Sequence, residues 1–182
     1  MPLVRKCLQA FALAACLATS SQVQAQPIPA QQPIGDLETV AEIHGAMPTG
    51  IAVSSSGRIF INYPRWGDDV PFTVAEIVDG KPIAFPNTVW NQLGSASTQD
   101  KRIVSAQSVV IDPSGNHLWI VDTGSLRPHP ISYGGPKLIQ VSLENNKVLR
   151  TILIEPAALN PETYLNDVRF LFKTKAASYA FI

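Results

Sequence analysis

One segment that occurs twice is the feature that most constrains the fold of this chain. Residues 48–62 have the pattern of a strand, a Ser/Gly turn and a second strand, and residues 107–122 repeat it. The turn glycines Gly57 and Gly115 lie 58 residues apart, and a third copy begins on the same spacing at residues 165–170. Self-similarity at a long fixed period, with several strands per unit, is typical of a propeller or another repeat array.

The residues between these repeats indicate an all-β fold. Short apolar runs rich in Val, Ile, Thr and Phe alternate with Gly, Pro, Asn and Asp clusters, and no segment has a convincing helical pattern. Asp79-Gly80 and Asn145-Asn146 supply hairpin residues that tolerate positive φ. We therefore expect about four strands per unit, as in a propeller blade, near residues 38–44, 49–54, 58–63, 72–78, 107–112, 117–121, 137–143, 147–154, 166–170 and 178–182.

Two blades and part of a third cannot close a ring, because each blade needs a neighbour on both faces. A complete six-bladed version would need roughly 350 residues at this period. The expected fold of residues 37–182 is therefore a partial six-bladed β-propeller of about two and a half four-stranded blades, not closed. Open blade edges predict self-association. Residues 171–175 interrupt the strand-turn-strand pattern, which favours a truncated product or an incomplete sequence.

The N-terminus has the pattern of an export signal. Arg5 and Lys6 precede a short apolar run at residues 8–18, and small or aliphatic residues end at Ala25. This predicts a signal peptide at residues 1–25, too short to span a bilayer, followed by a Gln/Pro-rich linker at residues 26–36. The protein would then be secreted or periplasmic. The alternative is a bacterial lipobox that ends in Cys16 and makes the protein a lipoprotein anchored there.

Composition excludes several function classes. Cleavage after Ala25 removes both cysteines, so no disulfide or thiolate site is expected. It also removes two of the 14 Lys+Arg, leaving 12 against 14 Asp+Glu and a formal charge of −2. Without a basic run, nucleic acid is a poor partner. No later apolar run approaches the length of a membrane span.

Several motifs together resemble the yellow / major royal jelly protein family. The resemblance is carried by Asn-Tyr-Pro-Arg-Trp, Val-Pro-Phe-Thr-Val-Ala, His-Leu-Trp-Ile-Val-Asp-Thr-Gly, Pro-Lys-Leu-Ile and Leu-Asn-Asp-Val-Arg-Phe, at residues 62–66, 70–75, 117–124, 136–139 and 165–170. It implies a secreted six-bladed β-propeller. Roles in the family include nutrition, cuticle pigmentation and binding of biogenic amines. The type of export signal suggests a bacterial member. Fold alone does not assign function.

Five residues are candidates for ligand binding: Arg65, Trp66, Asp122, Asn166 and Asp167. Arg65-Trp66 offers an Arg-aromatic patch, or packing with a salt bridge to Asp68 or Asp69. Asp122 lies at a strand end, where Asp-Thr-Gly also suits a turn cap.

Asn166-Asp167 lies where a distant resemblance to gluconolactonase-type propellers would place one ligand of an axial divalent metal. Hard cations such as calcium need several such oxygens, and the equivalent positions, residues 48–49 and 106–107, hold no carboxylate. We therefore expect no cofactor and no metal site. The histidines have no metal-ligand spacing either; they are His44, His117 and His129.

The sequence favours small-organic-ligand binding at the propeller channel of the full-length parent. One alternative is a lactonase-like hydrolase or a tautomerase, for which we assign no catalytic residue. A second alternative is a non-functional truncation product.

We expect export with cleavage after Ala25, because the basic residues, the apolar run and the small residues stand in signal-peptide order. N-terminal sequencing of exported protein should begin at Gln26. A mature chain that begins at a lipid-modified Cys16 would instead establish the lipoprotein.

Overall fold

The computed structural model describes residues 30–32, 35–127, 131, 134–173 and 177–182. The chain divides into two units, Met1–Leu37 and Glu38–Ile182, and the fold described below is that of the second. The predicted signal peptide, its cleavage site and Cys16 lie outside the described residues.

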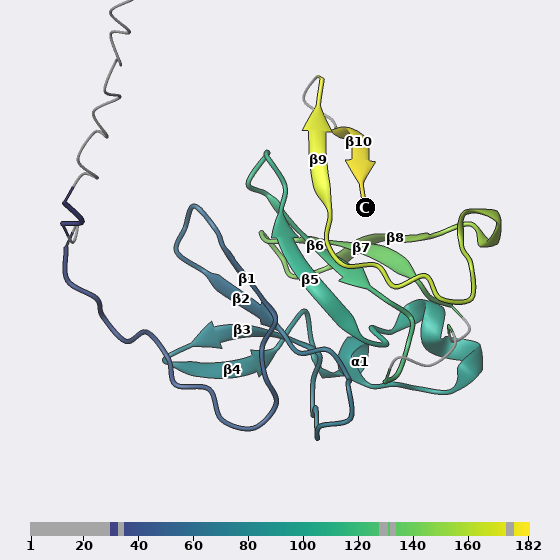
Figure 1. Ribbon diagram of the computed structural model, residues 1–182, viewed down its shortest axis with the longest axis horizontal. Helices are drawn as coiled ribbons and strands as arrows, with labels where there is room; N and C mark the ends of the chain where they lie inside the picture. Colours follow the sequence, from purple (N-terminus) through teal and green to yellow (C-terminus); the bar gives the residue numbers. More distant parts are fainter. Residues whose placement is uncertain (1–29, 33–34, 128–130, 132–133, 174–176) are drawn as a thin grey trace, which may run out of the picture. The chain divides into compact units, whose positions relative to one another are not determined.

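Two four-stranded antiparallel sheets follow one another along the chain (Figure 1). In each, the strands pair in chain order, as in propeller blades. The first sheet contains β1 (Gly50–Val53), β2 (Ile59–Asn62), β3 (Val74–Val78) and β4 (Lys81–Ala84). The second contains β5 (Ala106–Ile111), β6 (His117–Asp122), β7 (Lys137–Ser142) and β8 (Val148–Leu153).

A two-stranded sheet follows, formed by β9 (Arg169–Phe172) and β10 (Ala177–Phe181). It stands beside the second sheet in Figure 1. Short helices lie in the connections: α1 (Thr88–Asn91) and the 3-10 turns η1 (Ala96–Lys101) and η2 (Pro156–Ala158).

The sheets pack face to face and enclose two apolar cores. Phe60, Phe85, Leu118 and Ile139 belong to the core between the first and second sheets, and Trp90 packs against it from α1. The second core joins the other face of the second sheet to residues of the third. It includes Trp119, Val121, Leu138 and Val168, with Phe170 packed against them. Stacked four-stranded sheets that do not close into a ring make the described chain a partial β-propeller.

Most predicted strands are confirmed, with three differences. Residues 38–44 form no strand; Ile43 instead packs against the outer face of the first sheet. Strand β4 was not predicted; it contains Pro82, which is tolerated there because β4 is an edge strand. The connection at residues 85–102 contains the short helices α1 and η1 instead of being free of helix.

Hairpin chemistry explains the local order. Asp79 and Gly80 have φ of 50° and 73° and join β3 to β4 directly, as predicted. In the turn before β8, only Asn146 has positive φ, at 58°.

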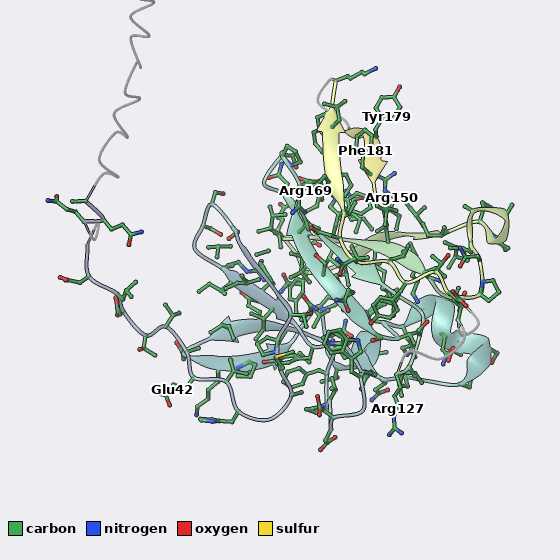
Figure 2. The ribbon with its side chains drawn as sticks, viewed as in Figure 1. Glu42, Arg127, Arg150, Arg169, Tyr179 and Phe181 are labelled. Carbon is green, nitrogen blue, oxygen red and sulfur yellow. The ribbon has the colours of Figure 1, made fainter. Side chains whose placement is uncertain are left out.

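Apolar side chains remain exposed on the first and third sheets. A cavity of about 710 Å³ lies between residues 38–43 and the outer face of the first sheet, where Ile51 is 67% exposed. On the third sheet, Phe181 is 60% exposed, and Tyr179 is also exposed (Figure 2). Among the described residues, no helix is long and apolar enough to cross a membrane.

Arg58 joins the first sheet to the second. Its guanidinium binds Glu76 at both oxygens, at 2.6 and 2.7 Å, and donates to the Leu143 carbonyl at 2.6 Å and the Asn146 side chain at 2.9 Å. It also lies over the Phe60 ring, 5.0 Å from the centroid. The hydrogen bonds to Glu76 raise the pKa of Arg58, so the group is cationic throughout the physiological range.

We expect Arg58→Lys to lower the free energy of unfolding by about 1–3 kcal/mol, because an ammonium cannot replace the planar fork that serves both sheets. Urea denaturation followed by circular dichroism measures the change. Lys81→Ala, at an exposed position of β4, is the control and should stay within about 0.5 kcal/mol of the unmodified chain. Equal stability of Arg58→Lys and the control would contradict this role.

Candidate functional site

The first strands of the first two sheets lie next to each other and form one wall of a groove. Strands β1 and β5 are each at the edge of their sheet and are in contact. The groove has a volume of about 470 Å³ and is lined by these two strands together with Asp167 and Arg169 at the start of β9. Polar side chains gather where these strands begin. We take this polar cluster as the candidate site.

A chain of hydrogen bonds crosses the cluster. The Trp66 indole N–H donates to the Tyr164 hydroxyl at 2.7 Å, and that hydroxyl donates to Gln107 Oε1 at 3.0 Å. Gln107 Nε2 then donates to Asn166 Oδ1 at 3.3 Å. Trp66 remains 41% exposed. We call these four residues the Trp66–Asn166 relay.

Asp167 lies beside the relay with its oxygens already occupied. Oδ1 accepts from the Ser108 hydroxyl at 3.0 Å and from the backbone N–H of the next residue, Val168, at 2.8 Å. Oδ2 lies 2.6 Å from Nη1 of Arg169, which Figure 2 labels at the base of the third sheet. The pair is partly exposed, so it contributes modestly to stability.

A second polar contact fixes the backbone of Gln107. The Thr49 hydroxyl donates to the Gln107 carbonyl at 3.1 Å, and Asn62 Nδ2 donates to the Thr49 hydroxyl at 2.8 Å. Asn62 in turn requires the glycine at position 50, because a Cβ there would lie 2.4 Å from Asn62 Oδ1. Close approach of β1, β2 and β5 therefore fixes the backbone position of Gln107 within the relay.

The structure brings three of the five predicted site residues together. Trp66, Asn166 and Asp167 lie in or beside the relay, although 98 residues separate Trp66 from its partner Tyr164. Gln107 and Tyr164 were missed. Positions 48–49, 106–107 and 166 are equivalent in the repeats, and this equivalence is the signal in the sequence that points to Gln107.

Arg65 is part of the scaffold. Nε donates to the Val104 carbonyl at 3.0 Å, Nη2 to the Asn91 carbonyl at 2.7 Å, and Nη1 to the Val70 carbonyl. Burial lowers the pKa of Arg65, while the charge of Asp122 opposes that effect. Three carbonyls thus occupy the guanidinium in place of the salt bridge expected with Asp68 or Asp69.

Asp122 is fully buried, and its carboxylate binds backbone N–H groups of the surrounding segments. Its carboxylate accepts backbone N–H bonds from Val104, Ser105 and Gly124 at 2.7, 2.9 and 2.9 Å. The ammonium of Lys137, which is also fully buried, lies 2.8 Å from Oδ2. The structure therefore supports the turn-cap interpretation, since no carboxylate oxygen of Asp122 is exposed to a ligand.

A carboxylate–imidazole pair that the sequence analysis did not anticipate locks the β5–β6 turn. Asp112 Oδ2 lies 2.9 Å from His117 Nδ1 and accepts from Trp119 Nε1 at 3.2 Å. Oδ1 accepts from the Ser114 backbone N–H at 3.1 Å. His129 lies outside the described residues. In the described part of the chain, no group of three or more His, Cys, Asp and Glu side chains could hold a metal ion.

Stacked four-stranded sheets, with a polar cluster at the starts of their first strands, define a β-propeller protein. A family model described as "Major royal jelly protein" matches residues 104–182. Protein yellow from Drosophila guanche is 28% identical over 130 residues, which cover 68% of this chain and 22% of that protein. Protein yellow from Drosophila melanogaster is 30% identical over 86 residues, or 44% of this chain and 15% of that protein.

The chain is therefore similar to proteins of the yellow / major royal jelly protein family over residues 104–182. The aligned region spans less than a quarter of the length of these curated relatives.

We expect Asp122→Asn to lower the free energy of unfolding by about 3–5 kcal/mol, because it leaves the buried ammonium of Lys137 without a counter-charge. The double variant Asp122→Asn with Lys137→Met should recover part of this loss. Urea denaturation of Asp122→Asn, of Lys137→Met and of the double variant measures the coupling energy between the two residues. Asp68→Asn, at an exposed position, is the control.

A loss for Asp122→Asn no larger than the control's would contradict the buried pairing. The pairing would also be contradicted if the double variant lost as much free energy of unfolding as the two single variants together.

Proposed function

We propose that this chain contributes to an exported yellow-like β-propeller that binds a small organic ligand at the polar cluster. The observation that carries the proposal is the Trp66–Asn166 relay, in which an exposed indole stands beside amide and hydroxyl groups held by hydrogen bonds. Ligand sites typically combine apolar or aromatic surface with a few well-placed polar groups. The indole of Trp66 offers the aromatic surface, and the relay offers the polar groups.

The groove lined by Ser108 and Asp167, the chain neighbours of Gln107 and Asn166, gives such a ligand space. Its volume of about 470 Å³ lies within the usual range of small-molecule sites, about 300–1,000 Å³. Thr49 and Ser108, two of its lining residues, also hydrogen-bond within the cluster. The relay joins Trp66 to the amides of Gln107 and Asn166, so a ring stacked on Trp66 would have its polar substituent near those amides.

The proposal also includes export and self-association. Export is supported by the order of basic, apolar and small residues at positions 1–25. Residues 26–36 would then act as a linker to the propeller domain at residues 37–182. Self-association is supported by the exposed apolar side chains of the first and third sheets, which include Ile51 and Phe181.

We expect Trp66→Ala to weaken ligand binding by about tenfold or more, because it removes the aromatic surface. Isothermal titration of phenylacetate, methyl phenylacetate and phenethylamine into the full chain measures this. Trp66→Phe should retain most of the affinity. Val89→Ala, an exposed apolar position outside the cluster, should change nothing.

If none of the three compounds binds up to millimolar concentration, or if Trp66→Ala binds as tightly as the unmodified chain, the polar cluster is not a ligand site of this kind.

A further inference from the structure

We propose that Gln107 and Tyr164 set the hydrogen-bond polarity of the site, so that Asn166 presents N–H donors and the site selects ligands with a carbonyl or carboxylate oxygen over ligands with an ammonium group. This inference rests on the proposed function for its ligand, but its structural core, the orientation of two side-chain amides, can be tested without one.

The direction of the relay follows from the chemistry of its first member. An indole nitrogen can only donate a hydrogen bond. The Tyr164 oxygen therefore accepts from Trp66 at 2.7 Å, and its own proton is free to go to Gln107 at 3.0 Å. A tyrosine proton needs an acceptor, which in Gln107 can only be Oε1. The tryptophan thus orients the glutamine amide through the tyrosine.

The orientation of Gln107 then determines that of Asn166. With Oε1 directed to Tyr164, the atom of Gln107 nearest to Asn166 is the donor Nε2, and Asn166 meets it with Oδ1 at 3.3 Å. Asn166 is exposed, and its Nδ2 has no protein partner among the described residues. Two N–H donors of Asn166 are therefore available to a ligand.

The charged neighbours reinforce this polarity. The Asp167 carboxylate is occupied by Ser108, by the Val168 backbone N–H and by Arg169. Arg169 uses Nη1 for Asp167 and for the Val168 carbonyl, and its side chain is largely exposed with further N–H groups. The acceptors beside the relay are thus engaged while donors remain, which favours an oxygen acceptor on the ligand and disfavours a cation.

The ligand class that fits is an aromatic ring bearing a carboxylate or carbonyl group. The ring would lie on the exposed face of Trp66, and the oxygen would accept from Asn166. An ammonium at the same place would meet N–H groups and lose hydrogen bonds that water supplies.

The test compares phenylacetate, methyl phenylacetate and phenethylamine on the full chain by isothermal titration. We expect phenylacetate to bind about tenfold more tightly than phenethylamine. Methyl phenylacetate, which keeps the acceptor without the charge, should bind more tightly than phenethylamine as well. Tyr164→Phe removes the hydroxyl that orients Gln107 and should erase most of the preference.

Gln107→Glu should reverse the preference. A carboxylate at position 107 has only acceptors, so Asn166 would turn its Nδ2 towards it and present Oδ1 to the ligand. Asn166→Asp, at an exposed position that tolerates change, removes the donors directly and should act in the same direction. Lys81→Gln alters the net charge by the same amount at an exposed position of β4, outside the polar cluster, and should change the ratio of affinities by less than about threefold.

Hydrogen exchange of the side-chain amides, followed by nuclear magnetic resonance on the ligand-free chain, tests the orientation separately. The Nε2 protons of Gln107 should exchange more slowly than the Nδ2 protons of Asn166. The reverse order would overturn the inference.

Equal or tighter binding of phenethylamine would also overturn the selectivity, as would an unchanged preference in both Gln107→Glu and Asn166→Asp. If none of the three compounds binds while the exchange order holds, the proposed function fails and the selectivity with it, whereas the relay's orientation stands.

Discussion

The buried ion pair between Asp122 and Lys137 is the interaction on which the rest of the structure depends. Both side chains are fully buried, and the two residues face each other in register between β6 and β7. A charge without water must be paired and hydrogen-bonded, so the carboxylate also holds the backbone N–H groups of Val104 and Ser105. The entry into β5 is thereby fixed against the end of β6.

Hydrogen bonds connect this ion pair to the first sheet and to the candidate site. The Ser105 hydroxyl accepts from the Arg65 backbone N–H at 2.9 Å, and the Arg65 guanidinium is held by carbonyls of three connecting segments. Arg65 precedes Trp66 along the chain, and Ser105 lies two residues before Gln107. Both ends of this arrangement therefore position members of the relay.

Much of the fold could be predicted because its determinants are local. The strand-turn-strand repeats around Gly57 and Gly115 follow from turn chemistry and alternating apolar residues, and Asp79-Gly80 marks its hairpin directly. The errors arose where context overrides local preference. Pro82 is acceptable because β4 is an edge strand, and residues 38–44 contact the outer face of a sheet instead of pairing with a strand.

The sequence by itself determined the repeat, the all-β blades and the motifs that resemble the yellow / major royal jelly protein family, which include Trp66, Asp122 and Asn166. Only the tertiary structure decided their roles. Asp122 and Arg65 are enclosed by backbone groups, whereas Trp66 and Asn166 are joined through Tyr164 and Gln107. The physical reason is distance along the chain: strand patterns depend on neighbouring residues, but hydrogen bonds between residues 57 to 98 positions apart exist only after the sheets have stacked.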